Sequence, residues 1–405
     1  MLKVAWRNIW RNWQRTAITG GAIAFNTAFL IVAIALNDGM LNQTIDSITA
    51  VVLGQAQVHA PGYRVTRSFY DTIADPGRVL KAADQAGVGA VARAYGSGLL
   101  SVGNKSSGAQ FWGVDARRER AVFELARQIH HGSYLSDAPP KGVREVVLGS
   151  KLASSLHAEV GEEVVAVVQA RDGSIGNDLF VVRGILKTVA SDIDRSAAII
   201  HQRDFDSIFS AQHPVHEIAL LDPRRRNSEA VASIARAAAP EAEVLTWEQL
   251  APAPAKMSEL LTAFTVVFAL IFSLAAGMGV MNSMLMSTFD RMREFGVLKA
   301  LGATPWRIVR DVATEAFVLT AVFSMVGTGV GFTANLLLHR YGLNLYTGDD
   351  LKVAGIAFDP IWRATLDAET VILPSILMIC VGVLASLYPA VKAARLDPVV
   401  AMTEP

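Results

Sequence analysis

The side chains that could carry chemistry are few in this sequence, and their spacing does not favour a catalytic or metal site. His213, His216 and Glu217 are of metal-binding types, but an intervening proline would break a helix that aligned them, and no fourth ligand is suitably spaced. His130 and His131 lack further ligands in the same way. We interpret these as ordinary loop histidines and expect no metal on this chain.

The acidic and nucleophilic residues lead to a similar expectation. Asp192, Asp194, Asp204 and Asp206 form an acidic cluster in the sequence, which solvated turn and capping positions explain. No spacing indicates a Ser/His/Asp or Cys/His arrangement. The G-x-x-x-x-G-K-[ST] loop that cradles nucleotide phosphates does not occur in the 405 residues. We therefore expect no catalytic residue, no cofactor-binding residue and no P-loop ATP site on this chain.

Composition indicates a membrane protein. Hydrophobic residues make up 52% of the chain and charged residues 18%, with a mean hydropathy of +0.34 and a formal net charge of +0. A soluble domain rarely combines these values, and the neutral charge gives no sign of nucleic-acid binding. The single cysteine, Cys380, excludes an intrachain disulfide, so a large soluble domain must be stable through its own core.

Four long stretches contain no Asp, Glu, Lys or Arg. They lie in the gaps between Arg15 and Asp38, Glu259 and Asp290, Glu315 and Arg340, and Glu369 and Lys392. Each supplies the roughly 20 apolar residues that a bilayer-spanning helix needs, and a backbone in hydrocarbon must satisfy its own hydrogen bonds. We therefore predict a polytopic α-helical membrane protein with four transmembrane helices.

The region between the first two spans has the pattern of a large α+β extracytoplasmic domain. Strand-like segments bounded by Gly, Asp or Pro alternate there with helical patterns. We predict strands at 51–59, 99–102, 110–114, 145–148, 163–169, 179–186, 197–200 and 217–221, and helices at 77–86, 117–128, 151–156, 203–209 and 228–238.

The charge distribution sets the expected orientation. Lys and Arg dominate residues 1–15, the loop after the second span and the C-terminal tail, whereas acidic residues dominate the loop between the third and fourth spans. The positive-inside rule then places both termini in the cytoplasm. A cleaved signal peptide is the alternative for the first stretch, but its apolar run is long and no small-residue cleavage site is evident near 36–39.

These observations divide the chain into nine segments. They are an interfacial amphipathic helix (1–15), TM1 (16–38), the extracytoplasmic domain with stalk ends (39–256), TM2 (258–289), a cytoplasmic coupling helix (290–304), TM3 (305–339), an outer loop (340–368), TM4 (369–391) and a cytoplasmic tail (392–405).

The first and second spans each have a distinctive flank or length. Before TM1, aromatic and basic residues recur at helical spacing and predict a membrane-surface anchor, with a plain basic flank as the alternative; they are Trp6, Arg7, Trp10, Arg11 and Trp13.

In TM2, the 30 uncharged residues Leu260–Phe289 would extend about 45 Å as a helix, beyond the roughly 30 Å hydrocarbon core. Either the helix continues as a stalk or it tilts.

The segment between the second and third spans has the character of a docking element. Residues 294–300 predict a short amphipathic helix with Phe295, Leu298 and Leu301 on one side, ended by Gly302. Its charges suit a groove in a soluble partner, and we find no intrachain role for the charged face that includes Glu294. We take Leu298 as part of the apolar contact side.

This segment carries a family resemblance. D-R-M-R-E-F-G-V-L-K-A-L-G-A at 290–303 resembles the signature of the FtsX-like/MacB-like permease domain of ABC transporters. The start A-W-R-N-I-W-R-N at 5–12 and the ending Y-P-A-V-K-A-A-R-L-D-P-V-V-A-M at 388–402 are similar to the family's termini. In the large domain, G-Q-A-Q-V-H-A-P-G-Y at 54–63 is similar to a segment of the lipoprotein-releasing permeases LolC and LolE, so the resemblance is nearest to that branch.

The resemblance implies mechanotransmission in a bacterial inner (cytoplasmic) membrane. A separate cytoplasmic ABC ATPase dimer would bind ATP and Mg, and a second permease, the same chain or a paralogue, would pair with this one. Membrane lipids and a periplasmic lipoprotein carrier or adaptor are the further implied partners. The implied ATPase-coupling residues are Arg291, Arg293, Glu294, Phe295, Gly296, Leu298, Lys299 and Gly302.

Two further sets of residues have structural interpretations. Gly277, Gly279, Gly327 and Gly331 permit close helix approach, either within the chain or at a dimer contact. Arg307, Asp311 and Glu315 lie near the start of TM3, where charges need partners. We expect charge pairing at the inner interface, with Arg307 and Asp311 as an i,i+4 pair.

Three functions remain open from the sequence. The first is release of lipoproteins toward a periplasmic carrier. The second is export of another hydrophobic compound or peptide, as in MacB-like efflux. The third is an FtsX-like, non-transporting signalling scaffold that controls a cell-wall hydrolase, against which the size of the extracytoplasmic domain argues.

Overall fold

The structure is a computed structural model that describes residues 6–7, 10–140, 142–224, 227–344, 351–353, 356–358 and 361–395. Parts of the predicted interfacial helix, outer loop and tail lie outside these residues. The chain divides into two compact units: a helical unit of Met1–Asn42, Met257–Tyr346 and Ile361–Pro405, and an α+β unit of Gln43–Lys256 and Thr347–Pro360.

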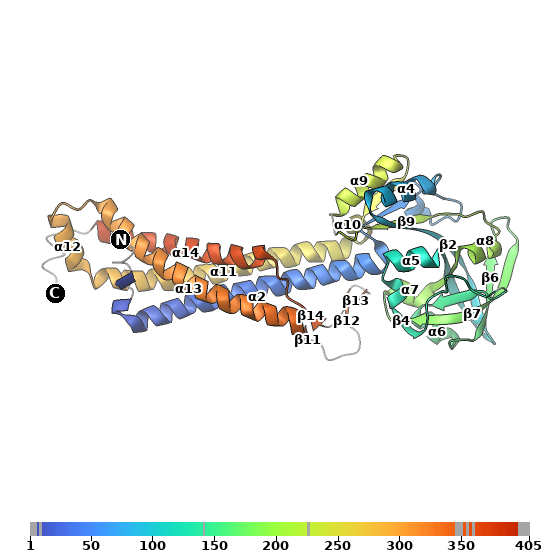
Figure 1. The fold of residues 1–405 in the computed structure, drawn as a ribbon, viewed down its shortest axis with the longest axis horizontal. Helices are drawn as coiled ribbons and strands as arrows, with labels where there is room; N and C mark the ends of the chain where they lie inside the picture. The colour runs from blue at the N-terminus through green and yellow to red at the C-terminus, as the bar shows by residue number, and fades with distance from the viewer. Residues whose placement is uncertain are drawn as a thin grey trace. The chain divides into compact units, whose positions relative to one another are not determined.

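Among the residues that the structure describes, four helices are long and apolar enough to cross a membrane. They are α2 (Trp13–Ile48), α11 (Pro252–Phe289), α13 (Pro305–Tyr341) and α14 (Ala368–Ala394), drawn as long ribbons in Figure 1. Together with the large α+β unit they confirm the predicted fold class. The short helix α12 (Met292–Ala300) joins α11 to α13, and the chain before α14 forms two small antiparallel pairs, β11 (Leu343–Asn344) with β14 (Ile361–Trp362) and β12 (Leu351–Val353) with β13 (Ile356–Phe358).

The α+β unit is built on one ten-stranded sheet. Its strands are β1 (Ala56–His59), β2 (Gly89–Val102), β3 (Lys105–Val114), β4 (Ile129–Gly132), β5 (Glu145–Leu148), β6 (Glu163–Gln169), β7 (Ile175–Leu186), β8 (Ala197–His201), β9 (Glu217–Leu221) and β10 (Glu243–Thr246). Its helical elements are η1 (Thr49–Leu53), α3 (Tyr63–Thr66), α4 (Pro76–Ala86), α5 (Ala116–Val122), η2 (Leu125–Arg127), α6 (Ser150–Leu156), α7 (Ser191–Ser196), α8 (Gln202–Ile208), α9 (Ser228–Ala238) and α10 (Trp247–Leu250).

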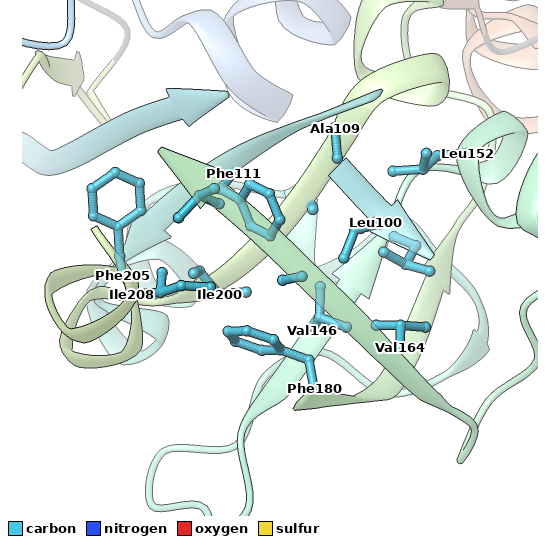
Figure 2. Close-up of a cluster of buried hydrophobic side chains, with 14 of the residues drawn as sticks. Leu100, Ala109, Phe111, Val146, Leu152, Val164, Phe180, Ile200, Phe205 and Ile208 are labelled. Carbon is cyan, nitrogen blue, oxygen red and sulfur yellow. The ribbon is translucent and has the colours of Figure 1, made fainter. Parts of the chain in front are cut away.

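Six of the strands close on themselves. The sheet runs β2-β3-β8-β5-β7, and β6 pairs with both β7 and β2, which completes a ring. Alternate residues of these strands point inward and form a fully apolar core that includes Leu100, Phe111, Val146, Phe180 and Ile200 (Figure 2). Closure removes free edges from this part of the sheet, as in a small barrel.

Three of the remaining strands extend from β2 as an open sheet in the order β10-β1-β9-β2, and the fourth, β4, pairs with β7 of the ring. Helices α4 and α9 cover one of its faces and bury Val79, Ala83, Val231 and Ala235 against it. Because β2 belongs to both the ring and the open sheet, residues on β2 connect the two cores.

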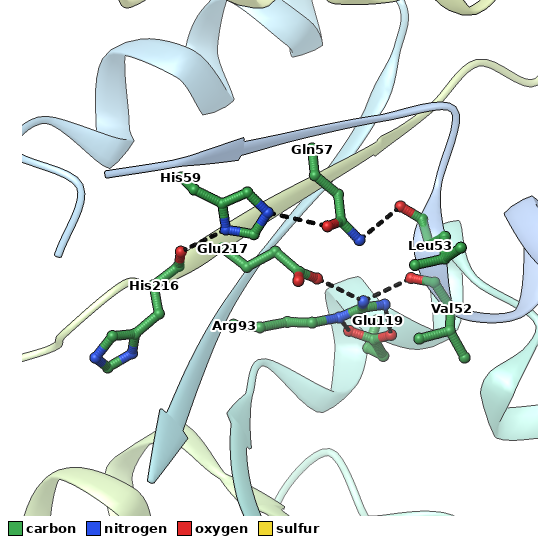
Figure 3. A network of polar contacts seen from close by, with 8 residues as sticks. All are labelled: Val52, Leu53, Gln57, His59, Arg93, Glu119, His216 and Glu217. Carbon is green, nitrogen blue, oxygen red and sulfur yellow. Dashed lines mark hydrogen bonds and ion pairs between the residues drawn. The ribbon is translucent and has the colours of Figure 1, made fainter. Parts of the chain in front are cut away.

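One such residue is Arg93, whose side chain is completely buried. Its Nε and Nη2 donate to Glu119 of α5 at 3.2 and 2.6 Å, and its Nη1 donates to Glu217 of β9 at 2.9 Å (Figure 3). The same Nη1 donates to the carbonyl of Val52 in η1 at 2.6 Å. Burial alone would lower the pKa of Arg93, and Glu119 and Glu217 hold that pKa well above its usual value. Arg93 thus ties η1, the turn that directly follows α2, to the sheet.

Several predicted elements differ in the structure. The strand predicted at 51–59 is wrong in its first half, because the chain leaving α2 stays helical as the π-helix η1 and only Ala56–His59 is a strand. Gly54 makes that switch with a φ of +71°, and a Cβ there would lie 2.5 Å from the carbonyl oxygen of Leu220. The helix predicted at 117–128 ends at Val122, and the chain continues through η2 into β4.

Replacing Arg93 by Met should destabilise the α+β unit by about 3–5 kcal/mol, because Glu119 and Glu217 would stay buried without their cation. Pulse proteolysis of the full chain in detergent across a urea series should show cleavage of this unit at lower urea. The control is Arg127→Met, since the Arg127–Glu124 pair is exposed and should contribute at most about 1 kcal/mol. Equal unfolding midpoints for the two variants would contradict a structural role for Arg93.

Candidate functional site

The candidate site is the coupling segment, defined here as residues 290–302, which includes α12. Gly302 ends the segment with a φ of +92°, and Pro305 begins α13. One side of α12 is buried: Phe295 is 3% exposed and packs with Ile308 and Val312 of α13 and Ala390 of α14. The buried side of α12 therefore packs into a core that the chain itself forms with α13 and α14.

This burial corrects the predicted contact side. Phe295 faces the chain's own helices, and Leu298 packs partly against the same cluster. Of the three predicted residues only Leu301 is strongly exposed, at 80%, and the other exposed apolar side chains are Val297 and Trp306, at 48% and 71%. Any partner surface on the coupling segment is therefore centred on Val297 and Leu301, and Leu298→Asp would disturb intrachain packing.

Arg291 is the electrostatic centre of the segment. Its side chain is 14% exposed, its Nη1 donates to Glu315 of α13 at 2.8 Å and its Nε donates to Glu294 at 2.9 Å. Ser287 of α11 also donates to Glu315, at 3.4 Å. Because the Glu315 side chain is only 8% exposed, this pair is buried, and removal of either partner leaves a costly charge.

The charged face of α12 does have intrachain partners, contrary to our sequence interpretation. Glu294 accepts from Arg11 at 3.1 Å as well as from Arg291. Burial alone would raise the pKa of Glu294, but the hydrogen bonds from Arg291 and Arg11 lower it below its ordinary value. A Glu294→Lys variant would thus break intrachain ion pairs as well as any partner contact.

Two further contacts fix the segment to its neighbours. Asp290 accepts from Arg15 of α2 at 3.1 Å, and Lys299 donates to the carbonyl of Ala394 at the end of α14 at 2.9 Å. The coupling segment is therefore connected to α2, α13 and α14 at once. Arg293 is exposed, and Gly296 is buried.

The charge pairing predicted near the start of α13 is only partly as expected. Glu315 is paired, but with Arg291 and not with a residue of its own helix. No ion pair joins Arg307 to Asp311 among the described residues. Sequence spacing could not show this, because Arg291 reaches Glu315 across a helix-to-helix contact.

The predicted packing glycines fall into two groups. A Cβ on Gly327 would lie 2.4 Å from the carbonyl oxygen of Ala24, and one on Gly331 would lie 3.1 Å from Ala28, both in α2. A Cβ on Gly277 would lie 2.8 Å from Val381 of α14. Gly279, by contrast, has nothing within 4 Å of a built Cβ. Three of the four glycines therefore serve close packing within the chain.

The remaining predicted residues have structural surroundings. Trp6, Trp10 and Trp13 are 47%, 49% and 63% exposed, and the rings of Trp6 and Trp10 lie 5.8 Å apart. His216 is buried, accepts from the amide of Tyr95 at 3.0 Å and lies 2.9 Å from the carbonyl of Phe69. No group of three metal-ligating side chains occurs among the described residues.

Comparison with known sequences decides the family. Residues 16–241 match the MacB-like periplasmic core domain, and residues 266–398, which contain the coupling segment, match the FtsX-like permease C-terminal domain. The first match alone spans more than half of the chain. The chain belongs to the MacB-like, FtsX-like permease family.

Three relatives illustrate this permease family. The pyoverdine export ATP-binding/permease protein PvdT of Pseudomonas entomophila is 29% identical, covering 99% of this chain and 59% of the relative. The macrolide export ATP-binding/permease protein MacB of Marinobacter nauticus is 26% identical, covering 99% of this chain and 60% of the relative. The uncharacterised ABC transporter permease YknZ of Bacillus subtilis is 31% identical over 40% of this chain and 36% of the relative. The chain spans little more than half the length of PvdT and MacB.

Replacing Gly327 by Ala should destabilise the permease by about 1–3 kcal/mol, because the added methyl overpacks the α2–α13 contact. Gly279→Ala is the matched control, since it makes the same chemical change in open space. The readout is the melting temperature of the detergent-solubilised chain by size-exclusion chromatography after heating. A larger loss for Gly279→Ala would place the critical glycine contact outside this chain.

Replacing Arg291 by Gln should also destabilise the helical unit, by about 3–5 kcal/mol, because Glu315 loses its buried counter-ion. The double variant Arg291→Gln/Glu315→Gln should recover most of that stability, since no charge is left buried. Arg307→Gln, at an exposed position of α13, should leave the melting temperature nearly unchanged. No recovery in the double variant would show that the Arg291 side chain acts through packing and not through charge.

Proposed function

We propose that this chain is the permease subunit of an ATP-driven ABC transporter that works by mechanotransmission. ATP and Mg would be bound by a cytoplasmic ATPase dimer outside these 405 residues, and the chain itself would carry no catalytic site. The observation that supports this is the coupling segment, which charge pairs fix to α2 and α13 and a Lys299 hydrogen bond fixes to α14, and which exposes Val297 and Leu301 on its other side. The printed names of PvdT and MacB pair an ATP-binding function with a permease.

In this proposal the coupling segment and both termini lie in the cytoplasm of a bacterium, and the α+β unit lies outside the inner membrane. The Lys/Arg bias of the flanking segments supports that orientation. Closure of the ATPase dimer would displace α12 and, through Arg291 and Glu315, α13. A second permease, identical or paralogous, would complete the assembly.

The substrate proposed first is a hydrophobic small molecule or peptide, exported as in MacB-like efflux. The names of PvdT and MacB, which refer to pyoverdine and macrolide export, favour it. Lipoprotein release toward a periplasmic carrier is the second candidate, favoured by the LolC/LolE-like segment 54–63. In the structure this segment supplies structural contacts: His59 lies 3.0 Å from both the Gln57 side chain and the carbonyl of His216.

Replacing Leu301 by Asp, or Val297 by Asp, should reduce recovery of the partner ATPase by at least about tenfold, because a charge placed at a desolvated apolar contact costs more than about 1.4 kcal/mol. The tagged full chain would be purified from its native membranes, and P-loop ATPase subunits would be quantified by mass spectrometry. Val65→Asp is the matched control, since Val65 is 91% exposed and lies in the α+β unit. Undiminished ATPase recovery with both variants would refute the coupling segment as the docking element.

A further inference from the structure

Residues 60–75, here called the strap, lie between two cavities of the α+β unit. The strap joins β1 to α4 and contains the short helix α3. Its Tyr63 and Arg67 line both a cavity of about 290 Å³ and one of about 590 Å³, so these two side chains form part of the wall between the cavities. Displacement of the strap would therefore join the two cavities.

The strap is attached to the sheet around Phe69. The Phe69 ring lies 5.4 Å from the rings of both Phe209 and His216, and its carbonyl oxygen lies 2.9 Å from Nε2 of His216. Nearby, the Ile73 amide donates to the carbonyl of Val215 at 2.8 Å. Further hydrogen bonds come from exposed side chains, at 3.4 Å from Arg64 and 3.3 Å from Tyr70. His216 is therefore the side chain beneath the centre of the strap.

His216 holds the strap in its neutral form. The residue is completely buried, and its Nδ1 accepts from the amide of Tyr95 at 3.0 Å. A ring nitrogen that accepts a hydrogen bond carries no hydrogen, so the hydrogen of the neutral ring is on Nε2, which donates to the Phe69 carbonyl. Protonation would set a second ring N–H against the N–H of Tyr95. The site therefore fits the neutral imidazole and opposes the cation.

The neighbouring His59 has the opposite arrangement. Its Nδ1 lies 3.0 Å from the carbonyl oxygen of His216, and its Nε2 lies 3.0 Å from Oε1 of Gln57, whose amide nitrogen donates to the Leu53 carbonyl (Figure 3). Two oxygen acceptors suit a ring with hydrogens on both nitrogens. The ring of Tyr63 lies 5.6 Å from His59 and 5.4 Å from His216. Acid thus favours the contacts of His59 and opposes those of His216.

The surroundings of His216 set the direction of its pH dependence. Burial lowers the pKa of His216, and the Phe69 carbonyl and the Asp71 carboxylate oppose this only in part. Because the buried ring takes up a proton less readily than a solvated one, the strap is held most firmly above the ordinary pKa of 6.5 and less firmly as the pH falls below it. The other titratable or charged residues on the elements packed around His216 are Glu217 of β9, His59 of β1, Tyr63 of α3, and Arg93 and Tyr95 of β2, with Glu217 paired to Arg93 at 2.9 Å.

We propose that His216 and the strap form a pH-sensitive clasp: neutral His216 holds the strap against β2 and β9, and protonation of His216 by solvent releases the strap and joins the two cavities. One proton taken up on release increases the released fraction by up to about tenfold for each pH unit below the ordinary pKa. The clasp belongs to the α+β unit alone and does not depend on the proposed ATPase partner.

The test is hydrogen–deuterium exchange of the full chain in lipid nanodiscs at pH 7.5 and pH 5.5, corrected for the intrinsic exchange rates. In the wild type, protection of peptides from residues 60–75 should fall several-fold at pH 5.5, up to about tenfold, while peptides from β3 keep their protection. His216→Gln offers an oxygen acceptor and an amide donor but does not titrate, and its strap protection should be equal at both pH values. His131→Gln, the same change at an exposed position of β4, is the matched control and should behave as the wild type.

Asp71→Asn tests the sign of the charge effect. The carboxylate favours a protonated His216 while the strap is held, so its loss should enlarge the fall in strap protection between pH 7.5 and 5.5. The asparagine oxygen can still accept from the Thr66 hydroxyl, which now donates to Asp71 at 2.7 Å. This variant also decides the matter if His216→Gln does not fold.

Three results would overturn the clasp. They are equal strap protection at both pH values in the wild type, an undiminished fall in folded His216→Gln, and a smaller fall in Asp71→Asn than in the wild type. A parallel loss of protection in β3 would also overturn it, because the whole unit would then be unfolding. The ATPase-recovery experiment on Leu301 is unaffected by any of these results, so the two proposals fail separately.

Discussion

The buried ion pair between Arg291 and Glu315 is the interaction on which the helical unit depends. Apolar contacts between long helices are weakly directional, because lipid tails offer nearly the same environment as a leucine side chain. A charge pair with both side chains largely buried is directional, and it fixes where α12 lies against α13. Arg291, which belongs to the family motif, thus has a structural role within this chain that does not depend on any partner.

The α+β unit uses the same device. Arg93 bridges two carboxylates and also donates to the Val52 carbonyl in η1, immediately after α2. A cation beside the last carbonyls of a helical segment is favoured by the helix dipole as well as by the hydrogen bond. Before α2, Arg11 pairs with Glu294 of the coupling segment. A 36-residue helix is therefore held by arginine contacts near its first residue and just beyond its last.

The sequence was sufficient for the four long helices and insufficient for the contacts between elements. Uncharged stretches predicted four long helices because hydrocarbon leaves the backbone no alternative, and the 290–303 motif indicated the family that the comparisons then established. The predicted outward side of α12 is right for Leu301 and wrong for Phe295, because Phe295, Leu298 and Leu301 share an apolar pattern, and only the packing of α13 and α14 decides which are covered.

The same limit applies to polar contacts. Arg93 gives no local signal in the sequence, and its partners Glu119 and Glu217 lie 26 and 124 residues away. The packing glycines could be predicted only in part. Gly327 and Gly279 have similar sequence surroundings, but only Gly327 lies against the backbone of α2. A period of 3.6 residues predicts a face of a helix, but not which neighbour covers it.

The ion pairs of the coupling segment differ in exposure, and this difference indicates which contact breaks first when the segment is displaced. The Arg11–Glu294 side chains are 49% and 51% exposed, whereas those of Arg291–Glu315 are 14% and 8% exposed. An exposed pair contributes at most about 1 kcal/mol, and loss of one partner of a buried pair costs about 3–5 kcal/mol. A partner that pulls on α12 would therefore separate it from Arg11 before separating it from α13. Displacement of the coupling segment would then be passed to α13 through the buried pair, while the exposed contact with Arg11 is released.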